Sequence, residues 1–147
     1  MKSFKIAKKE MLYGGMKYFS SINRHSRVIV VGAGTGGMAV SSQLRNQGII
    51  QAEDITIFDP APIHYYQPGF TKIGGGIIND VRKIMYNMEK ITEGFNFQNT
   101  GISKIDPDKN RVETEKGELW TYDQLVIAAG LDVKMDSIPG NISKINN

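Results

Sequence analysis

The chain has 147 residues, of which 40% are hydrophobic and 22% charged, and its formal net charge is +3. This composition is typical of a globular protein, and the chain is long enough to form one compact domain. The sequence contains no cysteine, which excludes disulfides, cysteine nucleophiles and thiolate metal sites within these residues. No apolar run approaches the roughly 18 residues that a membrane-spanning helix needs.

The positive charge is concentrated at the start of the chain. Residues 1–27 carry seven basic side chains and one acidic one, a local net charge of +6, whereas residues 28–147 have a net charge of −3. We therefore expect no nucleic-acid surface on the folded part. A segment rich in Lys and Ser and almost without acid is typical of a mitochondrial targeting leader, which we predict for residues 1–27, with a basic tail as the alternative.

The next elements have the order of a βαβ unit. Residues 28–31, Val-Ile-Val-Val, are β-branched without polar alternation, which predicts a strand buried on both faces of a parallel sheet. A glycine-rich run over 32–37 follows, and then a predicted helix over 38–47 that Gly48 ends. A second buried strand is predicted at 55–58, ending in Asp59-Pro60.

The glycine-rich run fits a dinucleotide-binding fingerprint. Gly32 makes the tight turn out of the strand, Gly34 lets the backbone approach a diphosphate, and Gly37 lets the helix lie close to the sheet. The first helical turn then offers unpaired N–H groups to phosphate. The candidate cofactor-binding residues of this run are Gly32, Ala33, Gly34, Thr35, Gly36 and Gly37.

An acid lies at the position that the fingerprint requires. Asp59 follows the second strand, 22 residues beyond Gly37, where a carboxylate can accept hydrogen bonds from both ribose hydroxyls and disfavours a 2′-phosphate. The fingerprint alone fits NAD as well as FAD. A structural glycine turn, with Asp59 an incidental residue at the strand end, is the alternative.

An aromatic loop is predicted after Asp59, with the sequence His64-Tyr65-Tyr66-Gln67-Pro68-Gly69-Phe70. In a doubly wound sheet this loop leaves the ligand-binding edge, so Gln67 is a candidate for contact with the cofactor, with plain surface packing as the alternative. Asp80 is a candidate N-cap, and the apolar spacing over 81–91 predicts an amphipathic core helix ended by Gly94. The two histidines, His25 and His64, form no metal motif.

The remaining segment is typical of short strands. We predict an antiparallel meander of strands over 95–105, 111–114 and 119–122, separated by polar turns. Residues 125–130 then form a buried strand that ends in small residues and Gly130. Small side chains at this end would let a ligand lie close to the strand, although a plain strand end is the alternative.

This order of elements resembles the flavin-binding first third of the disulfide-reductase-like flavoproteins with two dinucleotide domains. Within that group, the loop 64–70, the glycines 74–76 and the segments 105–110 and 122–130 most closely resemble the mitochondrial sulfide:quinone oxidoreductase family. The likeness covers most of residues 28–140. It implies an α/β fold with a Rossmann-like βαβ FAD-binding domain and a small antiparallel β-meander, incomplete at the C-terminus.

The resemblance also implies roles for single residues. Thr35 and Gly36 would contact the FAD phosphates, Asp59 the adenosine ribose, Gln67 the flavin side, and Ile102 the adenine through its backbone. Asp59 stands where these enzymes commonly carry Glu. Such enzymes oxidise sulfide at a cysteine pair, pass electrons through FAD to ubiquinone, and rest on the inner mitochondrial membrane through C-terminal segments.

The cysteine pair that this chemistry uses is absent from the 147 residues. We therefore expect residues 28–147 to be a partial FAD-binding domain of a truncated chain that is inactive alone. Two alternatives remain open: a non-catalytic nucleotide-binding module, and the N-terminal part of a type II NADH:quinone oxidoreductase.

Overall fold

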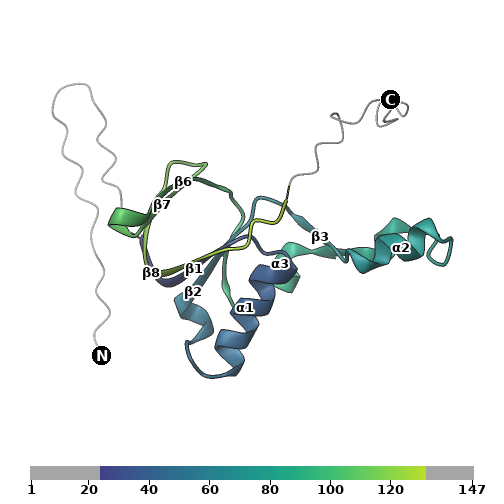
Figure 1. Ribbon diagram of the computed structural model, residues 1–147, viewed down its shortest axis with the longest axis horizontal. Coiled ribbons are helices and arrows are strands. Elements are labelled where there is room, and N and C mark those ends of the chain that lie inside the picture. Colours follow the sequence, from purple (N-terminus) through teal and green to yellow (C-terminus); the bar gives the residue numbers. More distant parts are fainter. Residues whose placement is uncertain (1–23, 132–147) are drawn as a thin grey trace.

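One six-stranded sheet organises residues 24–131, the part of the chain that the computed structural model describes (Figure 1). The strand order is β5-β2-β1-β8-β7-β6. The strands β5, β2, β1 and β8 are parallel, and β8, β7 and β6 continue the sheet as an antiparallel meander. The sheet strands are β1 (Arg24–Val31), β2 (Ile55–Phe58), β5 (Asn96–Gln98), β6 (Ile102–Asp106), β7 (Arg111–Thr114) and β8 (Leu119–Ile127).

This arrangement confirms the predicted Rossmann-like α/β fold with an antiparallel meander. The order β5-β2-β1-β8 corresponds to strands 3-2-1-4 of the doubly wound sheet. The other elements are short except for α1, and β3 and β4 form a second sheet. They are α1 (Thr35–Asn46), η1 (Ala52–Asp54), β3 (Ile63–Tyr65), α2 (Pro68–Gly74), η2 (Val81–Ile84), β4 (Met85–Asn87), α3 (Met88–Ile91) and η3 (Pro107–Lys109).

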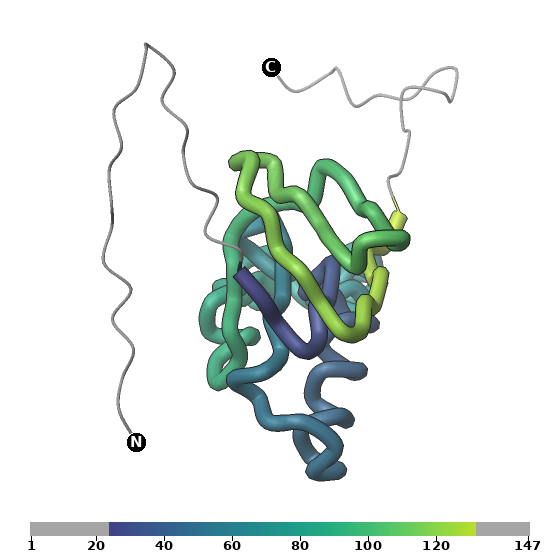
Figure 2. Tube along the Cα trace, turned by 90° about the vertical axis from the view of Figure 1, so that its left-hand side faces the viewer, coloured from purple at the N-terminus to yellow at the C-terminus, as the bar shows by residue number. Residues whose placement is uncertain are grey.

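The buried strand β1 has a different neighbour on each face. Val28 and Val30 pack in a cluster with β2 residues, and Met38 and Leu44 of α1 lie against it. Ile29, on the opposite face, packs with residues of the meander. Figure 2 shows the meander on one side of the parallel strands and α1 on the other. Both faces are therefore covered, which explains the unbroken run of β-branched side chains.

The first strand is longer than predicted. It begins at Arg24 and pairs with β8 from there on, with Arg24 opposite Trp120. The Arg24 guanidinium lies 2.7 Å from the Glu118 carboxylate and 5.4 Å from the centre of the Trp120 ring. These contacts hold Arg24 in the strand, although its composition places it in the predicted leader. The rest of the predicted leader lies outside the described residues.

The predicted helix over 81–91 is wrong. The segment consists of the 3-10 turn η2, the strand β4 and the short helix α3. Asp80 caps η2 as predicted, because its side chain accepts from the Arg82 N–H, but Asn87 caps a new helix by accepting from the Glu89 N–H at 2.8 Å. Ile84 and Met88 are both buried, so the apolar spacing is real although the chain between them is extended.

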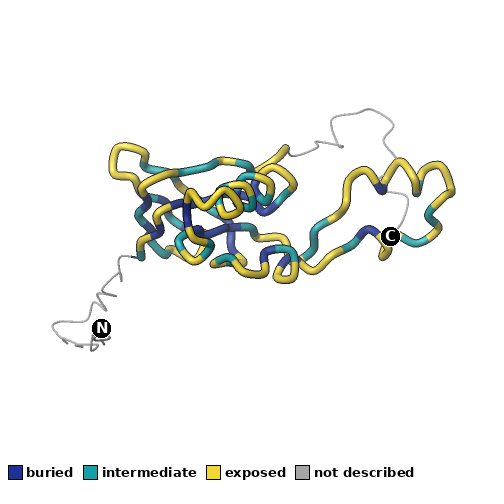
Figure 3. Tube along the Cα trace, turned by 90° about the horizontal axis from the view of Figure 1, so that it is seen from below, coloured by how far each residue is buried: buried dark blue, intermediate teal, exposed yellow. Residues whose placement is uncertain are grey.

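Strand pairing explains this difference. β4 forms an antiparallel pair with β3, in which His64 lies opposite Tyr86. Part of the aromatic segment predicted as a loop is therefore a strand, and residues from Pro68 onward form α2. Figures 1 and 3 show α2 and the chain around it extending from the body of the sheet as a largely exposed arm.

Two further predicted strands have different limits. The predicted strand over 95–105 is divided into β5, which joins the parallel sheet beside β2, and β6, which pairs with β7. The two strands predicted over 119–122 and 125–130 are instead one strand, β8, which ends at Ile127, so that residues 128–130 lie beyond it. It pairs with β7 through Leu119–Thr121 and with β1 along most of its length.

Helix α1 ends as predicted and begins earlier. Gly48 follows the C-cap with a left-handed φ of +67°, and its N–H donates to the Arg45 carbonyl at 3.0 Å. The helix begins at Thr35 rather than at residue 38, so the second half of the glycine-rich run belongs to its first turn. Within residues 24–131, no helix combines the length and the apolar character needed to cross a membrane.

Candidate dinucleotide-binding site

The loops that leave the carboxyl ends of β1, β2, β5 and β8 meet at one edge of the sheet. The chain passes from β1 to β2 on one side and returns to β8 on the other. The carboxyl ends of β1 and β8 therefore flank the switch point where doubly wound folds bind ligands. Backbone hydrogen bonds join the end of β1 to both of its neighbours. The Gly32 N–H donates to the Phe58 carbonyl of β2 at 2.7 Å, and the Ala128 N–H, just after β8, donates to the Val31 carbonyl at 2.8 Å.

Two glycines of the turn are required by the fold itself. Gly32 has a left-handed φ of +102°, and a Cβ on it would collide with the backbone of Ala128. A Cβ on Gly37 would collide with the carbonyl oxygen of Gly32. Gly32 therefore makes the tight turn, and Gly37 allows close packing of helix and strand.

Gly34 differs from these two glycines. Its φ of −68° and ψ of −174° are ordinary for any L residue, and a Cβ placed on it meets no protein atom within 4 Å. Packing of residues 24–131 therefore supplies no reason for glycine at this position. The open space beside Gly34 fits the close approach of a diphosphate to the backbone.

The first turn of α1 presents donors to the same space. Its N-cap, Gly34, makes no side-chain capping bond, and no acidic residue lies in the first turn. Thr35 and Gly36 are both exposed. N–H groups at a helix start have no intrahelical acceptor and carry a partial positive charge, so the turn fits the diphosphate of a dinucleotide.

Asp59 lies next to this turn. One carboxylate oxygen accepts from the Ala33 N–H at 2.7 Å, and the other accepts from the Ala61 N–H at 2.8 Å. Its backbone N–H donates to the Gln98 carbonyl at 3.2 Å, and its carbonyl accepts from the Asn99 side chain at 3.0 Å. Asp59 therefore links the loops that follow β1, β2 and β5.

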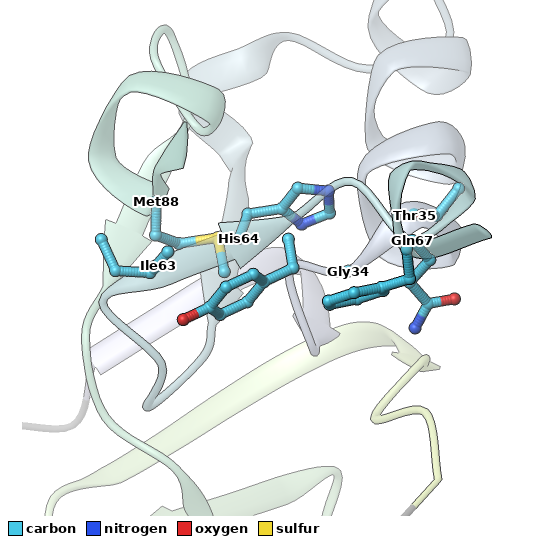
Figure 4. A pocket seen from close by; sticks show the side chains of 8 residues that line it. Gly34, Thr35, Ile63, His64, Gln67 and Met88 are labelled. Carbon is cyan, nitrogen blue, oxygen red and sulfur yellow. The ribbon is translucent and has the colours of Figure 1, made fainter. Parts of the chain in front are cut away.

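A pocket of about 290 Å³ opens in front of the glycine turn (Figure 4). It joins the turn to the predicted aromatic segment, because Gly34 and Thr35 line it together with Gln67. In Figure 4 the His64 imidazole lies between Met88 on one side and Thr35 and Gln67 on the other. The lining residues are Gly34, Thr35, Ile63, His64, Tyr65, Gln67, Phe70 and Met88.

Several of these lining residues were not singled out from the sequence. His64, Tyr65 and Phe70 belong to the aromatic segment that the sequence places near the ligand edge, and Tyr65 stacks on Phe70 with ring centres 5.9 Å apart. The apolar spacing predicts Met88 as a core residue, and it is buried. Its position at the pocket depends on the β3–β4 pairing, which no local pattern indicates.

Two predicted cofactor-binding residues lie elsewhere. Ile102 is the first residue of β6 and packs against the cluster that contains Ile29 and Phe58. Gly130 follows β8 with a left-handed φ of +74°, and a Cβ on it would meet no atom within 4 Å. Neither residue lines the pocket in front of Gly34.

Comparison with known proteins agrees with this geometry. Residues 26–147 match the family described as pyridine nucleotide-disulphide oxidoreductase. The chain is 35% identical to the mitochondrial sulfide:quinone oxidoreductase of Dictyostelium discoideum over 133 residues, which cover 86% of this chain and 28% of that protein. It is 31% identical to the type II NADH:quinone oxidoreductase of Staphylococcus epidermidis strain RP62A, over 78% of this chain and 28% of that protein.

A solved structure supports the same assignment. The sulfide:quinone oxidoreductase of Aquifex aeolicus superposes with a TM-score of 0.60 at 31% identity, over 75% of this chain and 25% of that one. The chain thus spans little more than a quarter of the length of these relatives. The resemblance to sulfide:quinone oxidoreductases is confirmed, and the matches indicate FAD as the cofactor. The chain belongs to the pyridine nucleotide-disulphide oxidoreductase family.

Proposed function

We propose that this chain supplies the FAD-binding unit of a flavoprotein that oxidises sulfide and reduces a quinone. The observation that carries the proposal is the open Gly34 at the start of α1, because packing within residues 24–131 does not account for a glycine there and a bound diphosphate would. The identity of the electron donor and acceptor rests on the similarity to sulfide:quinone oxidoreductases.

In this proposal, different residues of the site bind different parts of FAD. Gly34, Thr35 and Gly36 bind the diphosphate, and Asp59 holds the adenosine ribose. Gln67, which lines the pocket beside the turn, contacts the flavin side. Ile102 and Gly130 extend the contact toward the adenine and the strand end. FAD, when bound, supplies a ring system that can take up an electron pair and pass it on.

A second candidate is a type II NADH:quinone oxidoreductase. The 31% identity to the Staphylococcus epidermidis enzyme favours it, and the glycine turn serves both activities equally. A third candidate is a nucleotide-binding module without catalysis, because the 147 residues contain no cysteine to attack sulfide.

Measurements of flavin content and quinone reduction, made on the protein isolated from its own cells, separate these candidates. An antibody raised against residues 24–131 captures the native polypeptide, and its mass and flavin content are measured. We expect sulfide-dependent reduction of a soluble ubiquinone analogue. NADH-dependent reduction without sulfide dependence would favour the second candidate, and bound FAD with neither activity would favour the third.

We also propose that the protein is mitochondrial and that the complete enzyme associates peripherally with the inner membrane, where it reaches ubiquinone. We propose that the leader ends before Arg24, because residues from Arg24 onward pair with β8 and Ser26 donates to the Asp54 carbonyl at 3.0 Å. A fluorescent reporter carrying residues 1–23 is expected to enter mitochondria. A reporter that remains cytosolic would contradict the targeting proposal.

A further inference from the structure

The carboxylate of Asp59 is bonded to the glycine turn. The Ala33 N–H points at one of its oxygens, at 2.7 Å. Ala33 is fully buried, so its N–H lies on the protein side of the turn while Thr35 and Gly36 are exposed. The backbone at Ala33, which precedes the exposed Thr35 and Gly36, is therefore held by the side chain of Asp59, the residue that follows β2.

The same carboxylate also fixes its own loop. Its second oxygen accepts from the Ala61 N–H, and the Asn99 side chain donates to the Asp59 carbonyl. Bonds from N–H groups to a carboxylate are stronger than those between neutral groups. Movement of the glycine turn relative to β2 therefore requires the carboxylate of Asp59 to release either the Ala33 N–H or the Ala61 N–H.

We propose that Asp59 is a positioning residue that holds the glycine turn in its binding geometry. The inference rests on the proposed function, since it concerns the same FAD site. Each carboxylate oxygen can accept two hydrogen bonds, so both oxygens keep capacity for ribose hydroxyls. Asp59 then acts on the nucleotide in two ways, through the ribose directly and through the turn.

The length of the side chain suits this role. Asp is one methylene shorter than Glu, the other acidic residue. The shorter acid places its oxygen within hydrogen-bond distance of the turn at Ala33.

The test separates the two effects by removing the ribose hydroxyls from the ligand. Binding of ADP and of 2′,3′-dideoxy-ADP to the 147-residue chain is measured by calorimetry for wild type, Asp59→Ala and the control Asp108→Ala. Asp108 is exposed. Loss of one charged-acceptor bond predicts that Asp59→Ala weakens the dideoxy ligand about tenfold or more, and ADP further. Unchanged affinity for the dideoxy ligand would overturn the positioning role.

A second measurement needs no ligand. Amide hydrogen exchange at Ala33 is compared in wild type, Asp59→Ala and the milder Asp59→Asn, after circular dichroism has shown that each variant is folded. The proposal predicts that exchange at Ala33 accelerates at least about tenfold in Asp59→Ala and stays unchanged in Asp108→Ala. Equal protection in all variants would refute it. If wild type binds neither nucleotide, the proposed FAD function fails, while the exchange result still decides the role of Asp59.

Discussion

Substitution of Gly34 tests the diphosphate role with little disturbance of the fold. In Gly34→Val the new side chain meets no protein atom at its Cβ, and the φ of −68° suits an L residue. We expect the free energy of unfolding to change by no more than about 1 kcal/mol, because the loss of glycine flexibility in the unfolded chain favours folding. The variant should therefore remain folded.

The effect on the cofactor should be much larger. A branched side chain beside the first turn of α1 holds the diphosphate away from the exposed Thr35 and Gly36. Loss of two charged hydrogen bonds, each worth about 1.5–3 kcal/mol, weakens binding by about 3–6 kcal/mol. This corresponds to a rise in Kd of about 10²- to 10⁴-fold. The assay is FAD binding to the 147-residue chain, followed by the change in flavin fluorescence.

Two other glycines provide matched controls. Gly74 also has open space at its Cβ and no left-handed φ, and it lies outside the pocket lining. Gly74→Val should keep FAD affinity within about threefold. Gly32→Ala should instead lose the fold, because its Cβ collides with Ala128. Equal FAD affinity in Gly34→Val and Gly74→Val would refute the reasoning.

The remaining predictions concern the core and one surface pair. Ile57 is fully buried and Ile77 is 79% exposed, so Ile57→Ala should lower the free energy of unfolding by about 2–5 kcal/mol and Ile77→Ala by less than about 0.5 kcal/mol; equal losses in urea denaturation would contradict the packing. The Trp120 indole N–H is buried without a hydrogen-bond partner among residues 24–131, so Trp120→Phe should cost clearly less than the roughly 3–5 kcal/mol of Trp120→Ala; an equal cost would contradict this expectation. The Arg82 side chain lowers the pKa of Asp80, so this pair stabilises the fold above the ordinary carboxyl range and loses its effect as pH falls through the lowered pKa. In Arg82→Ala the pKa of Asp80, followed by NMR titration, should rise toward its usual value, and an unchanged pKa would show that the pair does not form in solution.

The glycine unit was predictable because its determinants are local. A run of β-branched residues, glycines at fixed spacing and an acid after the second strand lie within 28–59, and each acts on its immediate neighbours. The turn, the helix end at Gly48 and the neighbouring acid are all present in the structure. The sequence did not indicate that the Ala33 N–H bonds to Asp59, because this contact depends on the exact approach of β2 to the turn.

The segment from 63 to 91 was not predictable in the same way. Ile84 and Met88 have helical spacing, and both are buried, but the pairing of β4 with β3 joins residues at least 20 positions apart. The sequence pattern places Asn87 on the polar face of a helix, whereas in the structure it caps the start of α3. The wall of the pocket formed by His64 and Met88 depends on this non-local pairing.

The extent of β8 was also hidden from local patterning. Asp123 and Gln124 are exposed in the middle of the strand, and such polar residues favoured a break between two strands. The strand is continuous because β1 pairs with it along this stretch, with Val28 opposite Gln124. Polar side chains are tolerated there because they are exposed to solvent.

Titration of the chain with ADP, followed residue by residue in ¹H–¹⁵N NMR spectra, tests the central claim most directly. The account predicts saturable shifts that are largest for the backbone amides of Thr35 and Gly36, at the exposed start of α1. Saturable shifts that leave these two amides unchanged, or no saturable shift at all, would contradict a diphosphate site at the glycine turn.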